Sequence, residues 1–291
     1  MPEIHDLRSF ISCLESAGQL VRIKRPVNLE YELADVAAAL ERRRRPAPLF
    51  EVVNGSKWPI FSSAVASQTR AALALGCERS KVVEVMRHAL EPANGIPPVR
   101  IDEATDATEA AGATEAAGAT EAAGATGAAV AAKAAWKANV VTGDEVDVRK
   151  LPIPTHAVGD GGPFITGGVI FSKDPVSGRG NLSYNRMQVK NARQFGFNVN
   201  EWRHVREFLD AQEAKDEPLQ VAVAIGLDPA IMIAAGARYP DDELLIAGAI
   251  RGAGIPVSRG VTVDINIPAE AEMVIEGYLG AHERQAEGPL A

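Results

Sequence analysis

The segment Asn181-Leu-Ser-Tyr-Asn-Arg-Met-Gln188 carries the strongest indication of how this chain folds. It follows a glycine turn and alternates as a β-strand does. The two faces of that strand are Asn181, Ser183 and Asn185 on one side and Leu182, Tyr184 and Arg186 on the other. An arginine on an otherwise apolar strand face needs a partner. Arg186 is therefore either half of a structural ion pair or an anchor for a carboxylate or phosphate group.

Short predicted strands surround this segment and are separated by turns rich in glycine, proline and aspartate. We expect strands at 145–150, 165–172, 182–190 and 219–225. Helices are expected at 201–215, 229–235 and 241–251, the last with Asp241 or Asp242 as its capping residue. Strands and helices do not alternate regularly in this order. The pattern therefore predicts a strand-rich domain with helical insertions.

The first 102 residues predict a separate α/β domain of ordinary size. Helical spacing covers 7–16, with Asp6 as its N-cap, and also 31–44 and 79–89, while strands are expected at 20–23 and 49–53. The second helix ends in Arg42-Arg-Arg-Arg45 before Pro46. These arginines suit the negative end of a helix dipole, and the alternative is an anion or nucleic-acid patch.

Between the two predicted domains, the hexapeptide Ala-Thr-Glu-Ala-Ala-Gly occurs three times in succession from Ala107. A repeat this short, without large apolar side chains, cannot bury a core of its own. We therefore predict a flexible or partly helical surface insertion over 103–137, so that the second domain covers 138–291.

The composition of the 291 residues excludes several classes of protein. There are 30 Lys and Arg against 38 Asp and Glu, a net charge of −8 that argues against a general nucleic-acid binder. The sequence contains no run of about 18 apolar residues, so it predicts no membrane span. The N-terminus also lacks the apolar stretch of a signal peptide. Cys13 and Cys77 cannot form a disulfide framework. A cytoplasmic protein with reduced thiols is expected.

Other candidate site residues have ordinary explanations as well as functional ones. His204, in Trp202-Arg-His-Val, is either a surface or core histidine or a ligand. Glu243 begins a predicted helix, where the dipole alone favours an acidic residue. Several carboxylates follow in a partly apolar run from Pro268 to Gly277, and Glu287 lies beyond them. They are either solvated or part of an acid/base site. Dinucleotide-binding, P-loop and nucleophile-elbow motifs are missing.

Taken in order, these segments resemble the UbiD-like decarboxylases, which use prenylated FMN. The resemblance is carried by Asp6-Leu-Arg-Ser-Phe-Ile11, Leu151-Pro-Ile-Pro154, Gly159-Asp-Gly-Gly-Pro-Phe164, Asn181 to Val189, Ala224 to Ala230, Glu243 to Gly252 and Pro268 to Gly277. It implies an α+β fold in which an N-terminal α/β domain precedes a split β-barrel cofactor domain. That barrel is flavin-reductase-like and carries helical insertions. The comparison with the family leads us to expect that its C-terminal α/β domain is absent here.

The resemblance also implies roles for individual residues. Asn181, His204 and Glu243 would bind Mn²⁺ or Mg²⁺, which holds the cofactor phosphate, and K⁺ would lie nearby. An amide oxygen, an imidazole and a carboxylate, completed by phosphate and water oxygens, suit a hard octahedral ion. Arg186 and Glu287 are implied as a catalytic pair. The implied cofactor-binding residues are Asn181, Ser183, Tyr184, Arg186, Met187, Gln188, His204 and Glu243.

The implied activity is that of a carboxy-lyase: reversible, non-oxidative decarboxylation of an aromatic or α,β-unsaturated carboxylic acid. Loss of CO₂ from an sp² carbon needs an electron sink that no side chain supplies, which explains the cofactor. A flavin prenyltransferase would provide the prenylated FMN. Family members form homo-oligomers through the domain that is missing here. Which acid is the substrate stays open.

One departure from the family bears directly on activity. The family motif Glu-Gly-Pro-Phe-Gly is followed by a proton-donating acid, whereas this chain reads Glu287-Gly-Pro-Leu-Ala291 and ends. Leu290 stands where the family has phenylalanine. We therefore expect a C-terminally truncated member with impaired turnover. The alternatives are a non-catalytic fragment that binds flavin and metal, or one half of a split decarboxylase.

Overall fold

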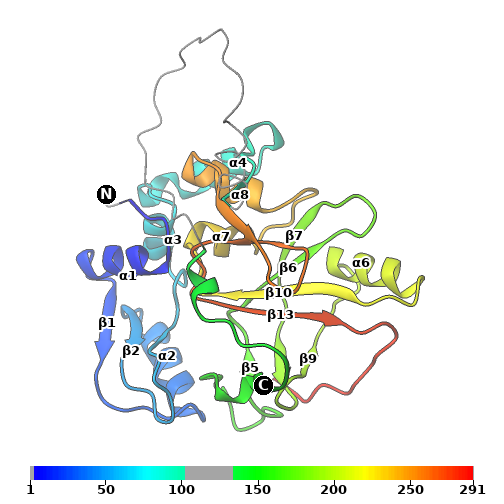
Figure 1. Cartoon of the computed structure of the whole chain (residues 1–291). Helices are drawn as coiled ribbons and strands as arrows, with labels where there is room; N and C mark the ends of the chain where they lie inside the picture. The colour runs from blue at the N-terminus through cyan, green and yellow to red at the C-terminus, as the bar shows by residue number, and fades with distance from the viewer. Residues whose placement is uncertain (1–2, 102–133, 291) are drawn as a thin grey trace, which may run out of the picture.

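A computed structural model describes residues 3–101 and 134–290, in which helices pack around four small sheets (Figure 1). No helix in these two ranges is long and apolar enough to cross a membrane. The alanine-rich repeat lies outside the described residues. The fold is mixed α+β, in agreement with the expected class.

The N-terminal region is a three-stranded sheet with its helices. The sheet order is β1-β2-β3, with β1 parallel to β2 and β2 antiparallel to β3. The elements are α1 Leu7–Ser16, β1 Leu20–Ile23, α2 Glu32–Arg42, β2 Ala47–Phe50, β3 Ile60–Phe61, α3 Gln68–Ala74 and α4 Val82–Ala89. The first predicted helix and strand are confirmed. The second helix is shorter than expected, because Tyr31 and Arg44 have positive φ angles of 65° and 54°.

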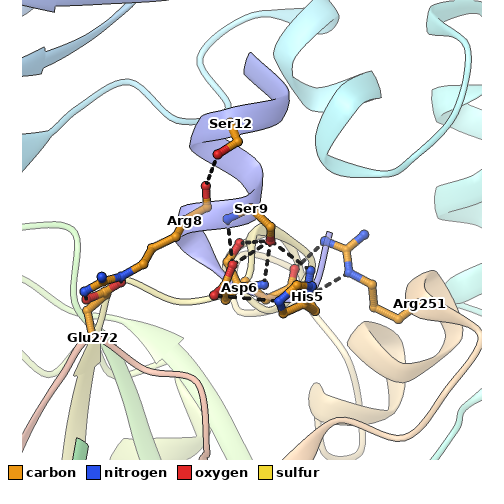
Figure 2. A network of polar contacts seen from close by, with 8 residues as sticks. His5, Asp6, Arg8, Ser9, Ser12, Arg251 and Glu272 are labelled. Carbon is orange, nitrogen blue, oxygen red and sulfur yellow. Dashed lines mark hydrogen bonds and ion pairs between the residues drawn. The ribbon is translucent and has the colours of Figure 1, made fainter. Parts of the chain in front are cut away.

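Polar contacts around the start of α1 join this region to the rest of the molecule (Figure 2). Asp6 is the predicted N-cap, and its Oδ1 accepts a hydrogen bond of 2.7 Å from the Ser9 amide. Arg8 reaches out of α1 to Glu272, with contacts of 2.6 and 2.7 Å between guanidinium and carboxylate. The Arg8 side chain is 79% exposed, so this pair contributes little to stability.

An arginine of a buried ion pair forms the second link. Arg251, at the end of α8 (Leu244–Arg251), pairs with Asp228, and their side chains are only 14% and 5% exposed. The Arg251 Nη1 also donates a hydrogen bond of 2.9 Å to the Ala74 carbonyl oxygen at the end of α3. Asp228 is also the N-cap of α7 (Pro229–Ala234). One arginine therefore holds the ends of three helices together.

The larger sheet forms the centre of the second region. Its order is β13-β10-β6-β7, and all neighbouring strands are antiparallel. Its strands are β6 Val169–Lys173, β7 Gly180–Tyr184, β10 Leu219–Ile225 and β13 Met273–Leu279. β10 is confirmed as predicted. It is buried on both faces, because Ala222 and Ala224 pack in the cluster that contains α7 and α8, while Val221 and Val223 pack in the cluster under α6 (His204–Glu213).

Two smaller sheets complete this region. One has the order β5-β8-β9, and the other has the order β12-β11-β4. Their strands are β4 Val99–Arg100, β5 Phe164–Ile165, β8 Met187–Val189, β9 Phe195–Phe197, β11 Pro256–Arg259 and β12 Asn266–Pro268. β4, from the N-terminal region, thus pairs with a strand near the other end of the chain.

Three strand predictions are corrected by the structure. The segment 145–150 forms 3-10 turns instead, because the Asp147 carboxylate accepts the Arg149 amide. The predicted strand at 165–172 is interrupted before β6, where a Cβ on Gly168 would lie 2.7 Å from the Val223 side chain. The predicted strand at 182–190 is broken after Tyr184, and its two halves belong to different sheets.

The last residues of the expected insertion are part of the fold. Ala134 is buried against Ile101 and Ala269, and the Trp136 Nε1 donates to the Pro268 carbonyl oxygen at 3.1 Å. These contacts fix the short 3-10 turn Ala135–Ala138 against the second region.

Candidate active site

Arg186 lies where the chain passes from one sheet to another. β7 ends at Tyr184 and β8 begins at Met187 in the neighbouring sheet, so Asn185 and Arg186 form the connection. The Asn185 side chain fixes this connection. Its Nδ2 donates to the Asn198 carbonyl oxygen at 2.7 Å, and its Oδ1 accepts from the Ser183 hydroxyl at 2.9 Å.

The ion pair implied between Arg186 and Glu287 is present. The Arg186 Nε lies 3.1 and 3.2 Å from the two carboxylate oxygens, and Nη2 lies 3.0 Å from Oε2. The Glu287 side chain is 13% exposed, whereas that of Arg186 is 38% exposed. Asn198 Nδ2 also donates to Glu287 Oε2 at 3.0 Å. Within the described residues, no hydrogen bond occupies the Arg186 Nη1, so this nitrogen can bind an anion.

Asn181, His204 and Glu243 come from three different elements and meet at β7. Asn181 lies on β7, His204 is the first residue of α6, and Glu243 precedes α8. The His204 Nδ1 lies 3.1 Å from the Asn181 Oδ1. Glu243 Oε2 accepts the amide of Leu182, the residue after Asn181, at 2.7 Å. β7 is the edge strand of its sheet, so this amide has no strand partner and takes the carboxylate instead.

Burial dominates the electrostatics of this group. Asn181, Ser183 and Glu243 are each 3% exposed. Burial raises the pKa of Glu243 to about 7, and the hydrogen bond from the Leu182 amide offsets part of that shift. Burial also raises the pKa of the neighbouring Asp242. A divalent cation at this position would offset the cost of a buried carboxylate.

The donor set fits a hard divalent ion. It offers one amide oxygen, one imidazole nitrogen and one carboxylate, without thiolate. In the ranges that the structure describes, no three His, Cys, Asp or Glu side chains cluster as a metal site. Asn181, His204 and Glu243 do not meet that definition, because only His204 and Glu243 are of those residue types and Asn181 is an amide.

Two implied cofactor-binding side chains lie away from this polar group. The Tyr184 hydroxyl donates to the Met232 carbonyl oxygen at 3.0 Å on the core side of β7, and burial raises its pKa to about 12. The Met187 side chain is 1% exposed and packs in the cluster with Val205 and Phe208. Contacts of Tyr184 and Met187 with a bound flavin would therefore have to come from their backbones.

The segment that carries Glu287 is bound to β8 and to the loop at 159–164. The Gln188 Nε2 donates to the Gly161 carbonyl oxygen at 2.6 Å, and its Oε1 accepts the Gly288 amide at 2.8 Å. The Gly161 amide donates to the Pro289 carbonyl oxygen at 2.8 Å. Lys190 Nζ donates to the Ala286 carbonyl oxygen, also at 2.8 Å. These contacts place Glu287 beside Arg186.

Sequence reasoning missed several residues of this arrangement. Asn185 shares a predicted strand face with Asn181 and Ser183, so its position was an available signal. Asn198 and Lys190 carried no such signal. The carboxylates of the late acidic run are dispersed, since Glu272 binds Arg8 while Glu276 accepts the amides of Val261 and Thr262. Glu287, further along the chain, is the carboxylate that pairs with Arg186.

Comparison with known families and structures now identifies the class. The family model "3-octaprenyl-4-hydroxybenzoate carboxy-lyase Rift-related domain" matches residues 128–291. The model of the N-terminal domain of the same carboxy-lyase matches residues 11–90. The first match covers more than half of the chain, which therefore belongs to the UbiD family.

Solved structures of this class have the same fold. An evolved dimeric form of the UbiD-class enzyme HmfF from Pelotomaculum thermopropionicum, in complex with prenylated FMN, is 30% identical. Its TM-score is 0.81, and the match covers 98% of this chain and 60% of that one. The 3,4-dihydroxybenzoic acid decarboxylase of Enterobacter cloacae is 29% identical with a TM-score of 0.77, covering 97% and 55%. Vanillic acid decarboxylase of Sedimentibacter hydroxybenzoicus, in its open form, is 25% identical with a TM-score of 0.80, covering 99% and 57%. This chain thus spans between 55% and 60% of the length of these proteins.

Proposed function

We propose that this chain carries the cofactor-binding part of a decarboxylase that removes CO₂ from an aromatic or α,β-unsaturated acid with prenylated FMN. The observation that carries the proposal is the Arg186–Glu287 pair, which lies a few residues along the chain from the Asn181–His204 contact. One group suits a carboxylate and the other suits a metal-bound phosphate. Solved structures of the relative HmfF hold prenylated FMN or FMN, and another relative is named as a 3,4-dihydroxybenzoic acid decarboxylase. Both facts support the assignment.

In this proposal Asn181, His204 and Glu243 hold Mn²⁺ or Mg²⁺, which binds the flavin phosphate, and K⁺ lies close to that phosphate. The ion suits this donor set, in which Asn181 and Glu243 are buried. Ser183, with the backbones of Tyr184 and Met187, would line the same face. The three sheets of the second region would form the split β-barrel of a cofactor domain over 138–291, with 1–102 as the N-terminal domain. The two family-model matches support that division.

The roles of the chain's own residues follow from the geometry. Arg186 would bind the substrate carboxylate through its free Nη1, while Glu287 fixes the orientation of the guanidinium through Nε and Nη2. When bound, prenylated FMN supplies the electron sink that decarboxylation requires. Asn198 donates to Glu287 and so keeps that carboxylate directed at Arg186. The impaired turnover expected from the sequence stays a prediction for the assay below.

The proposal includes partners and location. A small carboxylic acid is the substrate, a flavin prenyltransferase supplies the cofactor, and family members assemble as homo-oligomers. The cytoplasm is the proposed compartment, supported by two unpaired thiols, Cys13 and Cys77. Neither nucleic acid nor membrane is a proposed partner.

The test is anaerobic expression with a flavin prenyltransferase and Mn²⁺, followed by native mass spectrometry. We expect masses that correspond to protein with flavin and metal. A folded protein that carries neither would overturn the proposal. Release of CO₂ from a panel of aromatic and acrylic acids, and exchange of the product proton with deuterated solvent, then separates a working decarboxylase from a protein that only binds flavin.

A further inference from the structure

We infer that Gln188 is a positioning residue, whose side-chain amide holds the Glu287 segment against Arg186 and does not contact the cofactor. This inference rests on the proposed function for its catalytic meaning. The clamp itself, meaning Gln188 with Gly161 and Gly288, is a structural relationship that can be tested without flavin or substrate.

Both ends of the Gln188 amide bind backbone groups. Nε2 donates to Gly161 and Oε1 accepts from Gly288, at 2.6 and 2.8 Å, and the residue is 3% exposed. Lys190 Nζ donates a charge-assisted hydrogen bond to the same Oε1, which gives the amide a third partner. Turning the amide toward a ligand would break three hydrogen bonds of a buried side chain.

The clamp acts on the residue next to Glu287. Gly288 follows Glu287 directly, so fixing the Gly288 amide restricts where the Glu287 carboxylate can lie. Arg186 and Gln188 flank Met187 on the same stretch of chain. The segment from Arg186 to Gln188 therefore supplies the guanidinium and also fixes the backbone that presents its carboxylate partner. The relative position of the two charged groups is set by three consecutive residues of a buried strand end.

The two glycines are matched to the glutamine. A Cβ atom on Gly288 would lie 2.8 Å from the Gln188 Nε2, and one on Gly161 would lie at the same distance from that atom. Any larger residue at either position would push the amide out of place. The sequence pairs Gly-Asp-Gly-Gly at 159–162 with Glu-Gly-Pro at 287–289 around this side chain.

The experiment compares Gln188→Leu and Gln188→Glu with a control, Gln194→Leu. Gln194 is an exposed glutamine in the connection between β8 and β9. Hydrogen exchange of the peptides at 159–164 and 282–290 is measured by mass spectrometry in protein without flavin. We expect exchange in Gln188→Leu to rise about tenfold, the scale of one lost hydrogen bond, while exchange in β10 and in the control stays unchanged.

Gln188→Glu supplies a conservative variant with its own signature. A protonated glutamic acid keeps a donor for Gly161 and an acceptor for Gly288, whereas the ionised form has no donor and repels the Gly161 carbonyl oxygen. Protection of both peptides should therefore be near wild type in acid. As the pH rises, protection at 159–164 should fall because the donor to the Gly161 carbonyl oxygen is lost, while the ionised carboxylate still accepts from the Gly288 amide and from Lys190. If Gln188→Leu does not fold, this variant still tests the clamp.

Protein that carries Mn²⁺ and flavin is used to test the effect of the clamp on function. Mn²⁺ affinity and flavin content should match the wild type in both Gln188 variants, while apparent affinity for the carboxylate substrate falls about tenfold. If hydrogen exchange of both peptides is unchanged in Gln188→Leu, the clamp is wrong. The clamp is also wrong if a Gln188 variant loses flavin while its hydrogen exchange is unaffected. Altered exchange together with a wild type that binds no flavin would keep the clamp and reject the proposed function.

Discussion

Gly161 and Gly288 approach each other so closely that a Cβ atom on Gly161 would lie 2.7 Å from the Gly288 Cα. This backbone contact joins the loop at 159–164 to the segment that presents Glu287. Gly161→Ala should therefore lower the free energy of unfolding by about 1–3 kcal/mol, the range for an overpacked site. Gly167→Ala is the matched control, since nothing lies within 4 Å of its Cβ position. Equal urea midpoints for the two variants would show that the Glu287 segment moves aside without lowering the free energy of unfolding.

The Arg251–Asp228 and Arg8–Glu272 ion pairs should differ widely in their effect on stability. Arg251→Met leaves the 5%-exposed Asp228 carboxylate without its partner, and it should cost about 3–5 kcal/mol. Arg8→Met removes an exposed partner of Glu272 and should cost about 1 kcal/mol or less. Urea denaturation of both variants checks the comparison. A larger effect for Arg8→Met would mean that the exposed pair is the stronger link.

Tyr184 predicts a specific dependence on alkaline pH. Its pKa is about 12 in the folded protein, because of burial, against about 10 in an unfolded chain. The neutral hydroxyl therefore contributes stability that is fully present below pH about 10 and is lost as the pH rises through about 12. The stability difference between wild type and Tyr184→Phe should shrink across that window. Tyrosinate absorbance should lose its highest-pH component in the variant, and an unchanged titration curve would contradict the assignment.

Arg186 and His204 should separate substrate binding from metal binding. Arg186→Ala removes the group that is proposed to bind the substrate carboxylate, so any turnover should disappear while bound Mn²⁺ is kept. His204→Ala should instead lose bound Mn²⁺ and flavin, and any loss of turnover should follow from that. Metal analysis and turnover measured on the same preparations provide the check. Undiminished turnover in Arg186→Ala would remove that residue from the proposed site.

Local signals explain which parts of the fold could be predicted. The helix at 7–16 has apolar spacing and an aspartate cap, and the strand at 219–225 is a continuous apolar run, so both appear as expected. The strands β11 and β12 were missed because they are short and lie between glycines and prolines. β13 was missed because Glu276 and Gly277 interrupt its apolar residues and its residues are at most partly buried.

The site depends on contacts that no local pattern contains. The break after Tyr184 is stabilised by Asn185 and Asn198, which are 13 residues apart. The Gln188 partners Gly161 and Gly288 lie 27 and 100 residues away. The resemblance to a family provided Arg186 and Glu287 as a pair, because local patterns left Arg186 with two interpretations. Residues that act only by holding the backbone, such as Gln188, become visible when the chain is folded.

The separation of Arg186 from Glu287 along the chain also determines when their ion pair can form during translation. The two residues are 101 positions apart in the chain. At about 5–20 residues per second, a ribosome adds the carboxylate roughly 5–20 s after the guanidinium. Sheets that pair nearer strands, such as β6 with β7, can form in that interval. The Arg186–Glu287 pair is therefore formed late, and a nascent chain presents Arg186 to solvent or to a chaperone before its partner is made.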